Sequence, residues 1–226
     1  FAAMQRLMVV LVLAGCSSPN VRAPAPDELF DPKPNHHFHL ANGEVTVANI
    51  IPNHIDSLLA KLEEAGALLS VSDTEVTIYP SGRLKSVSLK TLPYPGFPTD
   101  LQPQVMAALC LAEGTSVVQE SVFQSRFLHV SELNKMGARI DIQSNSAIIN
   151  GVESLAGADV LATDLLAGAA LIIAGLAARD TTCVHNLGHI FRGYEKLEDK
   201  LRAIGANISI LPSEEDVKGV SELPRS

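Results

Sequence analysis

Two stretches of the chain are apolar on nearly every face of a helix. Residues 165–178 follow Thr163-Asp164, a good pair of helix N-cap residues, and residues 105–112 follow Pro98-Thr99-Asp100. A helix without a polar face must be surrounded by other elements, so both stretches are expected to lie in the core. The pattern alone favours Asp100 and Asp164 as caps of these two helices.

Amphipathic helices and strand pairs follow a fixed order around these stretches. The first unit has a strand at residues 44–47 and a helix that Pro52 opens. Gly66 suits the left-handed C-cap of that helix, and residues 68–71 and 75–79 are typical of a hairpin. The inward face of the helix repeats at helical spacing, with Ile55, Leu58, Leu59 and Leu62.

The same order returns twice. A hairpin from residues 139–142 to 147–149 follows the second surface helix, and a strand at residues 208–211 follows the third. The Gly-Ala corners recur 71 and 68 residues apart, so one domain with internal pseudo-threefold symmetry is expected. The fold class is α/β (α+β), a closed arrangement of three βαβαββ units with helices inside. The inward faces of the later helices are Phe127, Val130 and Leu133, then Tyr194, Leu197, Leu201 and Ile204.

Composition and charge narrow the function classes. Hydrophobic residues make up 46% of the 226 residues and charged residues 19%, as in a globular protein with a real core. The net charge of −8 without a basic block argues against nucleic acid as a partner. Cys16, Cys110 and Cys183 lie far apart, so no disulfide framework or zinc site is expected. Cys110 and Cys183 are interpreted as small buried apolar residues.

Residues 1–42 differ from the rest of the chain. A basic residue, a short apolar run and small residues before Cys16 resemble a bacterial lipoprotein signal peptide, and a buried helix or strand is the alternative. The run is too short to span a bilayer. His36, His37 and His39 lack further ligands at metal-binding spacing, so they are expected at an exposed strand edge. A polar tail, expected to be disordered, occupies residues 212–226.

Four separated motifs resemble those of the UDP-N-acetylglucosamine enolpyruvyl transferases. They occur in order and at the right spacing within residues 43–211, at Tyr94–Gln102, Ser121–His129, Ala162–Leu165 and His189–Glu195. The resemblance implies an inside-out α/β barrel domain over residues 43–211. It also implies transfer of the enolpyruvyl group of phosphoenolpyruvate to the 3′-hydroxyl of UDP-N-acetylglucosamine, a cytoplasmic step of peptidoglycan synthesis and cell wall biogenesis. Members of this family need no metal or organic cofactor.

The resemblance assigns roles to five residues. Asp100 matches the catalytic base that also binds the nucleotide sugar, and a carboxylate suits the removal of the hydroxyl proton. Val122 matches a nucleotide-sugar contact through its backbone, and Asp164 an aspartate that orients groups around the substrate. Arg192 matches an arginine that binds phosphoenolpyruvate, whose carboxylate and phosphate suit a guanidinium. Arg126 matches an arginine with a structural role. The alternative for Arg192 is a surface pair with Glu195.

The chain also departs from the family pattern. Leu166 stands where the family usually has an arginine that helps to bind phosphoenolpyruvate, and Phe191 replaces an aspartate. Gln124-Ser125 replaces a Glu-Asn pair. Family members are longer and carry a second barrel domain whose loop supplies the proton donor. The chain alone is therefore expected not to turn over.

Two alternatives to this assignment stay open. A non-catalytic remnant or UDP-sugar-binding module that keeps the fold is the alternative function. The substrates favour a cytoplasmic location, with a membrane-anchored lipoprotein through Cys16 as the alternative.

Overall fold

The computed structural model of this protein describes residues 38–41, 44–79, 81–124, 126–194 and 196–211. The apolar run before Cys16, the linker after it and the polar tail lie outside these ranges. The side chains of the predicted histidine cluster also lie outside what the structure describes.

The first predicted unit forms an antiparallel sheet with the strand order β1-β2-β4-β3. The predicted hairpin is confirmed, with Leu68 opposite Tyr79 and Val71 opposite Val76. Pro52 opens the helical segment, and all four residues predicted on its inward face are buried. The elements are β1 (Phe38–Ala41), β2 (Glu44–Ala48), η2 (Pro52–Ile55), α2 (Asp56–Glu64), β3 (Leu68–Val71) and β4 (Glu75–Tyr79).

The second unit forms a sheet with the order β5-β6-β8-β7, in which β5 runs parallel to β6 and the other pairs are antiparallel. The second predicted hairpin is confirmed by β7 and β8. Helix α4 is shorter than predicted, since Phe127 lies in the turn before it. Val130 and Leu133, which lie within the helix, are buried. The elements are β5 (Ser88–Lys90), β6 (Thr115–Gln119), α4 (Val130–Lys135), β7 (Arg139–Gln143) and β8 (Ser146–Asn150).

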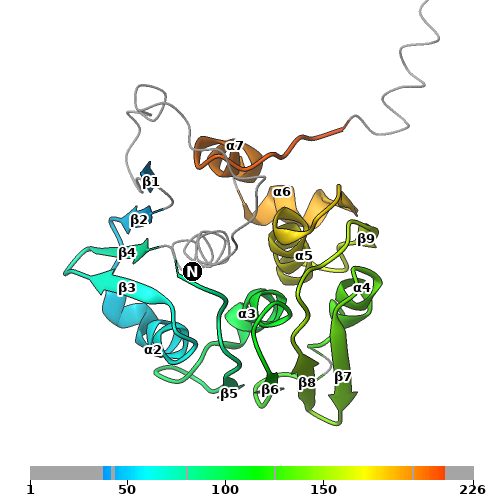
Figure 1. The fold of residues 1–226 in the computed structure, drawn as a ribbon, viewed down its shortest axis with the longest axis horizontal. Helices are drawn as coiled ribbons and strands as arrows, with labels where there is room; N and C mark the ends of the chain where they lie inside the picture. The colour runs from blue at the N-terminus through cyan, green and yellow to red at the C-terminus, as the bar shows by residue number, and fades with distance from the viewer. Residues whose placement is uncertain (1–37, 42–43, 80, 125, 195, 212–226) are drawn as a thin grey trace, which may run out of the picture.

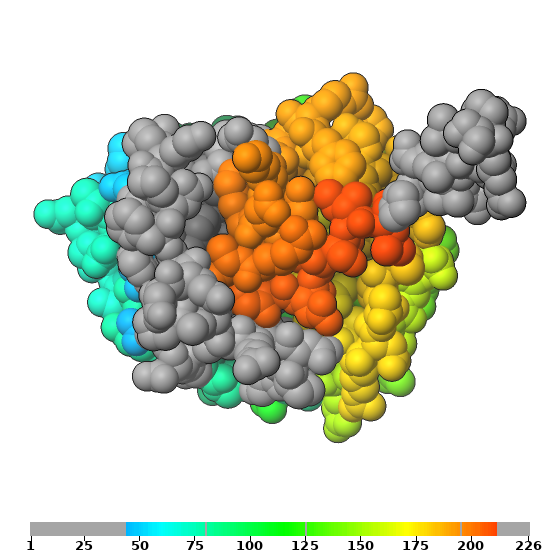
Figure 2. Space-filling model, turned by 90° about the horizontal axis from the view of Figure 1, so that it is seen from above, coloured from blue at the N-terminus to red at the C-terminus, as the bar shows by residue number. Residues whose placement is uncertain are grey.

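The third unit is less regular than predicted. Its four inward residues are buried, but they do not share one helix: Tyr194 follows α6, Leu197 and Leu201 lie on α7, and Ile204 follows α7. The segment around α7 lies across the face seen in Figure 2. The prediction of a strand at residues 208–211 is wrong. No strand in the described part of the chain forms a β-ladder with this segment. The elements are the parallel pair β9 (Asp159–Leu161) and β10 (Cys183–His185), then α6 (Gly188–Gly193) and α7 (Leu197–Ala203).

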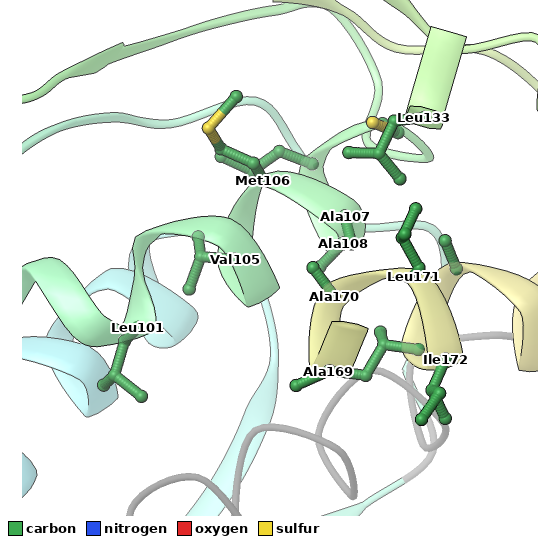
Figure 3. Close-up of a cluster of buried hydrophobic side chains, with 14 of the residues drawn as sticks. Leu101, Val105, Met106, Ala107, Ala108, Leu133, Ala169, Ala170, Leu171 and Ile172 are labelled. Atoms are coloured by element: carbon green, nitrogen blue, oxygen red, sulfur yellow. The ribbon is translucent and has the colours of Figure 1, made fainter. Parts of the chain in front are cut away.

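Two helices occupy the centre of the molecule, as their apolar sequences predict. Helices α3 (Gln102–Leu109) and α5 (Leu165–Ala177) pack against each other, with α2, α4 and α7 further out (Figure 1). All eight residues of α3 are buried, and so is every residue of α5 from Leu166 to Ala174. Ala108 and Ala170 face each other between the two helices (Figure 3), and such small side chains let backbones approach closely. Helices inside and sheets outside confirm the predicted inside-out α/β arrangement.

Cys110 ends α3 and lies in this core. Burial raises the pKa of its thiol to about 12, so it stays protonated and unreactive at neutral pH. Its interpretation as a buried apolar residue is confirmed. Cys183 lies in a strand, as predicted, and is half-buried.

Three helices end in the same way. Gly66, Gly137 and Gly205 have φ values of 90°, 88° and 86°, which glycine adopts readily. The alanine after each glycine donates its N–H to the carbonyl of a leucine five residues earlier, as in a Schellman motif. The pairs are Ala67–Leu62, Ala138–Leu133 and Ala206–Leu201, at 2.9, 3.2 and 3.0 Å. The corners predicted from the sequence are therefore geometrically equivalent.

Gly137→Ala is expected to lower the free energy of unfolding by about 1 kcal/mol. A Cβ at Gly137 would meet no atom within 4 Å, so the loss comes from the left-handed backbone alone. Gly188→Ala is the matched control, because its site is equally open and lies within the helical residues of α6. It is expected to be neutral or slightly stabilising in urea unfolding. Equal losses in both variants would contradict this explanation.

Candidate functional site

Asp100 lies in the short turn η3 (Thr99–Leu101) that leads into α3. Its carboxylate is paired with Arg126, with Oδ1 and Nη2 3.1 Å apart. The cap position of η3 is Pro98, and no side-chain hydrogen bond caps either η3 or α3. The cap interpretation, which the pattern alone favours, is therefore wrong. The carboxylate pairs instead with a guanidinium from another motif. The pair is 30% exposed on the Asp100 side and 25% on the Arg126 side, so solvent reaches it.

Arg126 joins two of the predicted motifs. Its guanidinium pairs with Asp100 and also lies over the ring of Phe123, 4.7 Å from the ring centroid. Val122 and Phe123 are both exposed next to it. The structure thus places Arg126 against both Asp100 and Phe123, and Val122 directly precedes Phe123 in the chain.

A buried carboxylate lies beneath this surface. Glu120 follows β6 and accepts hydrogen bonds from the backbone N–H groups of Val122 and Phe123 at 2.8 and 3.1 Å. The hydroxyls of Thr91 and Thr99 donate to the same carboxylate at 2.7 and 2.8 Å. Glu120 is not among the residues predicted from the sequence. The available signal was an acidic residue directly after a short strand that contains the pair Val117-Val118.

Asp164 caps the second central helix, as predicted. Its Oδ1 accepts the N–H groups of Leu166 and Ala167 at 2.8 and 2.9 Å. His129 lies close enough to sense its charge. Burial lowers the pKa of His129 to about 4, and the charge of Asp164 opposes that shift only in part. His129 is therefore neutral at pH 7.

Asp164→Ala is expected to lower the free energy of unfolding by about 1 kcal/mol, since two helix N–H groups lose their acceptor. Thermal unfolding at pH 7 measures the change. The exposed Asp141→Ala on β7 is the matched control and is expected to change stability by less than about 0.5 kcal/mol. A fully stable Asp164→Ala variant would show that solvent replaces the cap.

Arg192 lies on α6 and is exposed. Its Nε donates to the Gly188 carbonyl at 3.1 Å, and Nη2 is 2.9 Å from Nδ1 of His189. The guanidinium is thus folded against its own helix, and the alternative pair with Glu195 lies outside the described residues. Leu166 is buried at the start of α5 and offers no group to an anion.

Tyr194 directly follows α6 and is buried. Burial raises its pKa to about 12, the Gln104 amide lowers it in part, and the charge of Asp100 adds to the rise. No hydrogen bond of normal geometry satisfies the Tyr194 hydroxyl or the Gln104 amide in the described structure. Because Gln104 and Asp100 both affect the pKa of Tyr194, the tyrosine hydroxyl lies near both residues.

Neither a metal cluster nor a membrane-spanning helix is present in the described ranges. No group of three or more His, Cys, Asp or Glu side chains there is arranged to hold a metal ion. No helix in the same ranges is long and apolar enough to cross a bilayer.

The segment from β1 to α7 matches a known protein family. A family model described as EPSP synthase (3-phosphoshikimate 1-carboxyvinyltransferase) matches residues 39–201, more than half of the 226 residues. The chain belongs to this family. The matched segment includes the five residues to which the sequence resemblance assigned roles: Asp100, Val122, Arg126, Asp164 and Arg192.

Curated relatives are about half identical to the chain over the segments that match. A protein of a Nitratiruptor species, named UDP-N-acetylglucosamine 1-carboxyvinyltransferase, is 49% identical over 172 residues. The UDP-N-acetylglucosamine 1-carboxyvinyltransferase 2 of Carboxydothermus hydrogenoformans is 56% identical over 168 residues. These matches cover 76% and 74% of this chain but only 41% and 40% of those proteins. A relative from Desulfofundulus thermocisternus, with the same name as the first, is 49% identical over 173 residues, and the match covers 71% of its length.

Solved structures agree on the fold of this family member. The enolpyruvyl transferase NikO from Streptomyces tendae superposes with a TM-score of 0.72 at 22% identity, over 91% of this chain and 43% of that one. An EPSP synthase from Acinetobacter baumannii gives a TM-score of 0.63 at 16% identity, over 91% of this chain and 47% of that one. At these identities the superpositions establish the inside-out α/β fold.

Proposed function

We propose that this chain forms part of an enolpyruvyl transferase that joins phosphoenolpyruvate to the 3′-hydroxyl of UDP-N-acetylglucosamine. In that reaction the hydroxyl loses its proton, its oxygen bonds to the enolpyruvyl carbon, and the bond from that carbon to the phosphate oxygen breaks. Inorganic phosphate leaves. The reaction belongs to peptidoglycan synthesis, and both substrates are cytoplasmic, so we propose a cytoplasmic protein.

One observation carries the proposal: the Asp100–Arg126 pair, which joins two motifs of the resemblance at the entrance to a buried helix. The identity of about half to proteins named UDP-N-acetylglucosamine 1-carboxyvinyltransferase supports this acceptor. The family model alone, whose description names 3-phosphoshikimate, favours a different acceptor. The choice between the two can be tested.

Each residue has a distinct part in the proposed site. Asp100 accepts the proton of the 3′-hydroxyl and helps to bind the nucleotide sugar, while Arg126 orients its carboxylate. The backbone of Val122 contacts the nucleotide sugar. Asp164 orients groups around the substrate from the cap of α5. Arg192 binds the carboxylate or phosphate of phosphoenolpyruvate once its guanidinium releases the Gly188 carbonyl.

Residues 43–211 form the barrel domain in this proposal, with residues 1–42 and the tail 212–226 outside it. A second barrel domain of the same fold would complete the active site and supply the proton donor. We therefore expect the 226 residues alone to bind a substrate without steady phosphate release. A release rate that depends on both substrates would contradict this expectation.

A second candidate is a UDP-sugar-binding module without catalysis. The burial of Leu166 and the contacts of Arg192 within its own helix favour it, because both weaken the site for phosphoenolpyruvate. Charge-assisted hydrogen bonds contribute about 1.5–3 kcal/mol each, so a missing arginine removes much of that binding.

Calorimetric titration of UDP-N-acetylglucosamine into the purified chain tests the proposal, with 3-phosphoshikimate titrated in parallel. We expect binding of the nucleotide sugar only, and we expect Asp100→Ala to abolish it. Asp141→Ala, on the exposed side of β7, is the matched control and should bind as the unchanged chain does. Binding of 3-phosphoshikimate instead, or of neither ligand by a folded chain, would contradict the proposed acceptor.

A further inference from the structure

The Glu120 carboxylate accepts hydrogen bonds from three separate segments. Its side chain is at the end of β6, and the residue is only 3% exposed. Oε1 accepts from the Thr91 hydroxyl and from the N–H groups of Val122 and Phe123. Oε2 accepts from the Thr99 hydroxyl. Thr91 follows β5 and Thr99 begins η3, so the four donors come from the end of β5, from η3 and from the loop after β6.

Two of these segments carry residues of the proposed site. Thr99 directly precedes Asp100, and Val122 is itself the proposed nucleotide-sugar contact. The third segment is tied to the loop as well, because Ser121 donates its N–H to the Thr91 hydroxyl at 2.9 Å and its own hydroxyl to the Thr91 carbonyl. The buried Glu120 carboxylate thus connects the segment of Thr99 with the backbone of Val122 and Phe123.

An ionised carboxylate suits this arrangement, because it accepts at both oxygens and has no proton of its own to donate. Burial raises the pKa of Glu120, but the hydrogen bonds from Thr91, Val122, Phe123 and Thr99 together outweigh it and leave the pKa below its usual value. These four partners are hydroxyl and backbone N–H groups, so uncharged donors held by the fold stabilise the charge. The arrangement is typical of a charge that holds backbone in place.

We propose that Glu120 is a positioning residue of the transferase site, which fixes the spacing between Asp100 and the Val122 backbone. The identity of the ligand rests on the proposed function, whereas the geometry rests on the hydrogen bonds of Glu120 alone. The Arg126 contacts span the same two segments at the surface, where solvent competes. The buried Glu120 contacts are the ones that define the spacing.

Amide hydrogen exchange measured by NMR on the intact chain tests the geometry. In Glu120→Ala, the Val122 and Phe123 amides are expected to exchange at least about tenfold faster, because their acceptor is gone. Glu120→Gln keeps one oxygen and is expected to restore part of the protection. The matched control is Glu132→Ala, since this buried glutamate accepts the Leu161 N–H at 2.9 Å on another segment. It should accelerate Leu161 and leave Val122 and Phe123 unchanged.

Binding of UDP-N-acetylglucosamine to the same variants tests the positioning role. Glu120→Gln is expected to weaken the affinity about tenfold or more, and Thr99→Val should weaken it without faster exchange at Val122. These two variants also serve if Glu120→Ala does not fold. Protected amides in both Glu120 variants, or faster exchange with unchanged affinity, would overturn the proposal. If the unchanged chain does not bind the nucleotide sugar, the proposed function fails, and the exchange rates still decide whether Glu120 holds the two segments.

Discussion

Leu171→Ala is expected to lower the free energy of unfolding by about 3 kcal/mol. Leu171 is fully buried in α5, where it lies beside α3 and near Leu133 of α4 (Figure 3). Its removal would leave a cavity between the two helices around which the sheets are arranged. The neighbours on α3 are short alanines, which cannot move in to fill it.

Urea unfolding of the chain measures this loss. Leu68→Ala is the matched control, because Leu68 is 56% exposed on β3 and its truncation is expected to cost less than about 0.5 kcal/mol. A loss below about 1 kcal/mol in Leu171→Ala would show that the centre of the molecule is loosely packed, against the inside-out arrangement described above.

Acid is expected to destabilise the fold through His129 by about 2 kcal/mol between pH 7 and pH 5. Burial lowers the pKa of His129 from 6.5 to about 4 in the folded chain. Below pH 6.5 the unfolded chain therefore binds a proton that the folded chain does not. The stability that His129 contributes is fully present above the unfolded pKa of 6.5 and falls as the pH drops toward 4.

The difference between the unchanged chain and His129→Gln isolates this effect, since glutamine does not titrate. We expect the stability of the unchanged chain to fall relative to that of the variant over this range. Glu120 and Glu132 have pKa values lowered from 4.5, so they lose their contributions at more acidic pH. Parallel stability curves for the two proteins between pH 7 and pH 5 would contradict the low pKa of His129.

The parts of the fold that the sequence predicted rest on local physics. The all-apolar helices could only be buried, and the Gly-Ala corners needed a left-handed residue at Gly66, Gly137 and Gly205. Both hairpins followed from short runs of strand-forming residues on either side of turn residues. The strand predicted at residues 208–211 failed because β-propensity cannot reveal whether a partner strand is present.

The candidate site could be predicted only where its contacts are local. Asp164 caps the helix that starts beside it, so its contacts follow from sequence position. Asp100 has the same local pattern, but a partner 26 residues away, Arg126, takes its carboxylate. Glu120 was missed for the same reason, since its donors are defined only by tertiary structure or by the turn after β6. The folding of Arg192 against His189 depends on a rotamer that no sequence pattern specifies.

Chemical-shift mapping with UDP-N-acetylglucosamine tests the central claim most directly. The backbone amides of the isotope-labelled chain would be assigned and followed as the nucleotide sugar is added. We predict that the largest shifts occur at Asp100, at Val122 and Phe123, and near Asp164. Shifts confined to the exposed edge strands β3 and β7, or no shifts in a folded chain, would contradict a nucleotide-sugar site at the entrance to α3.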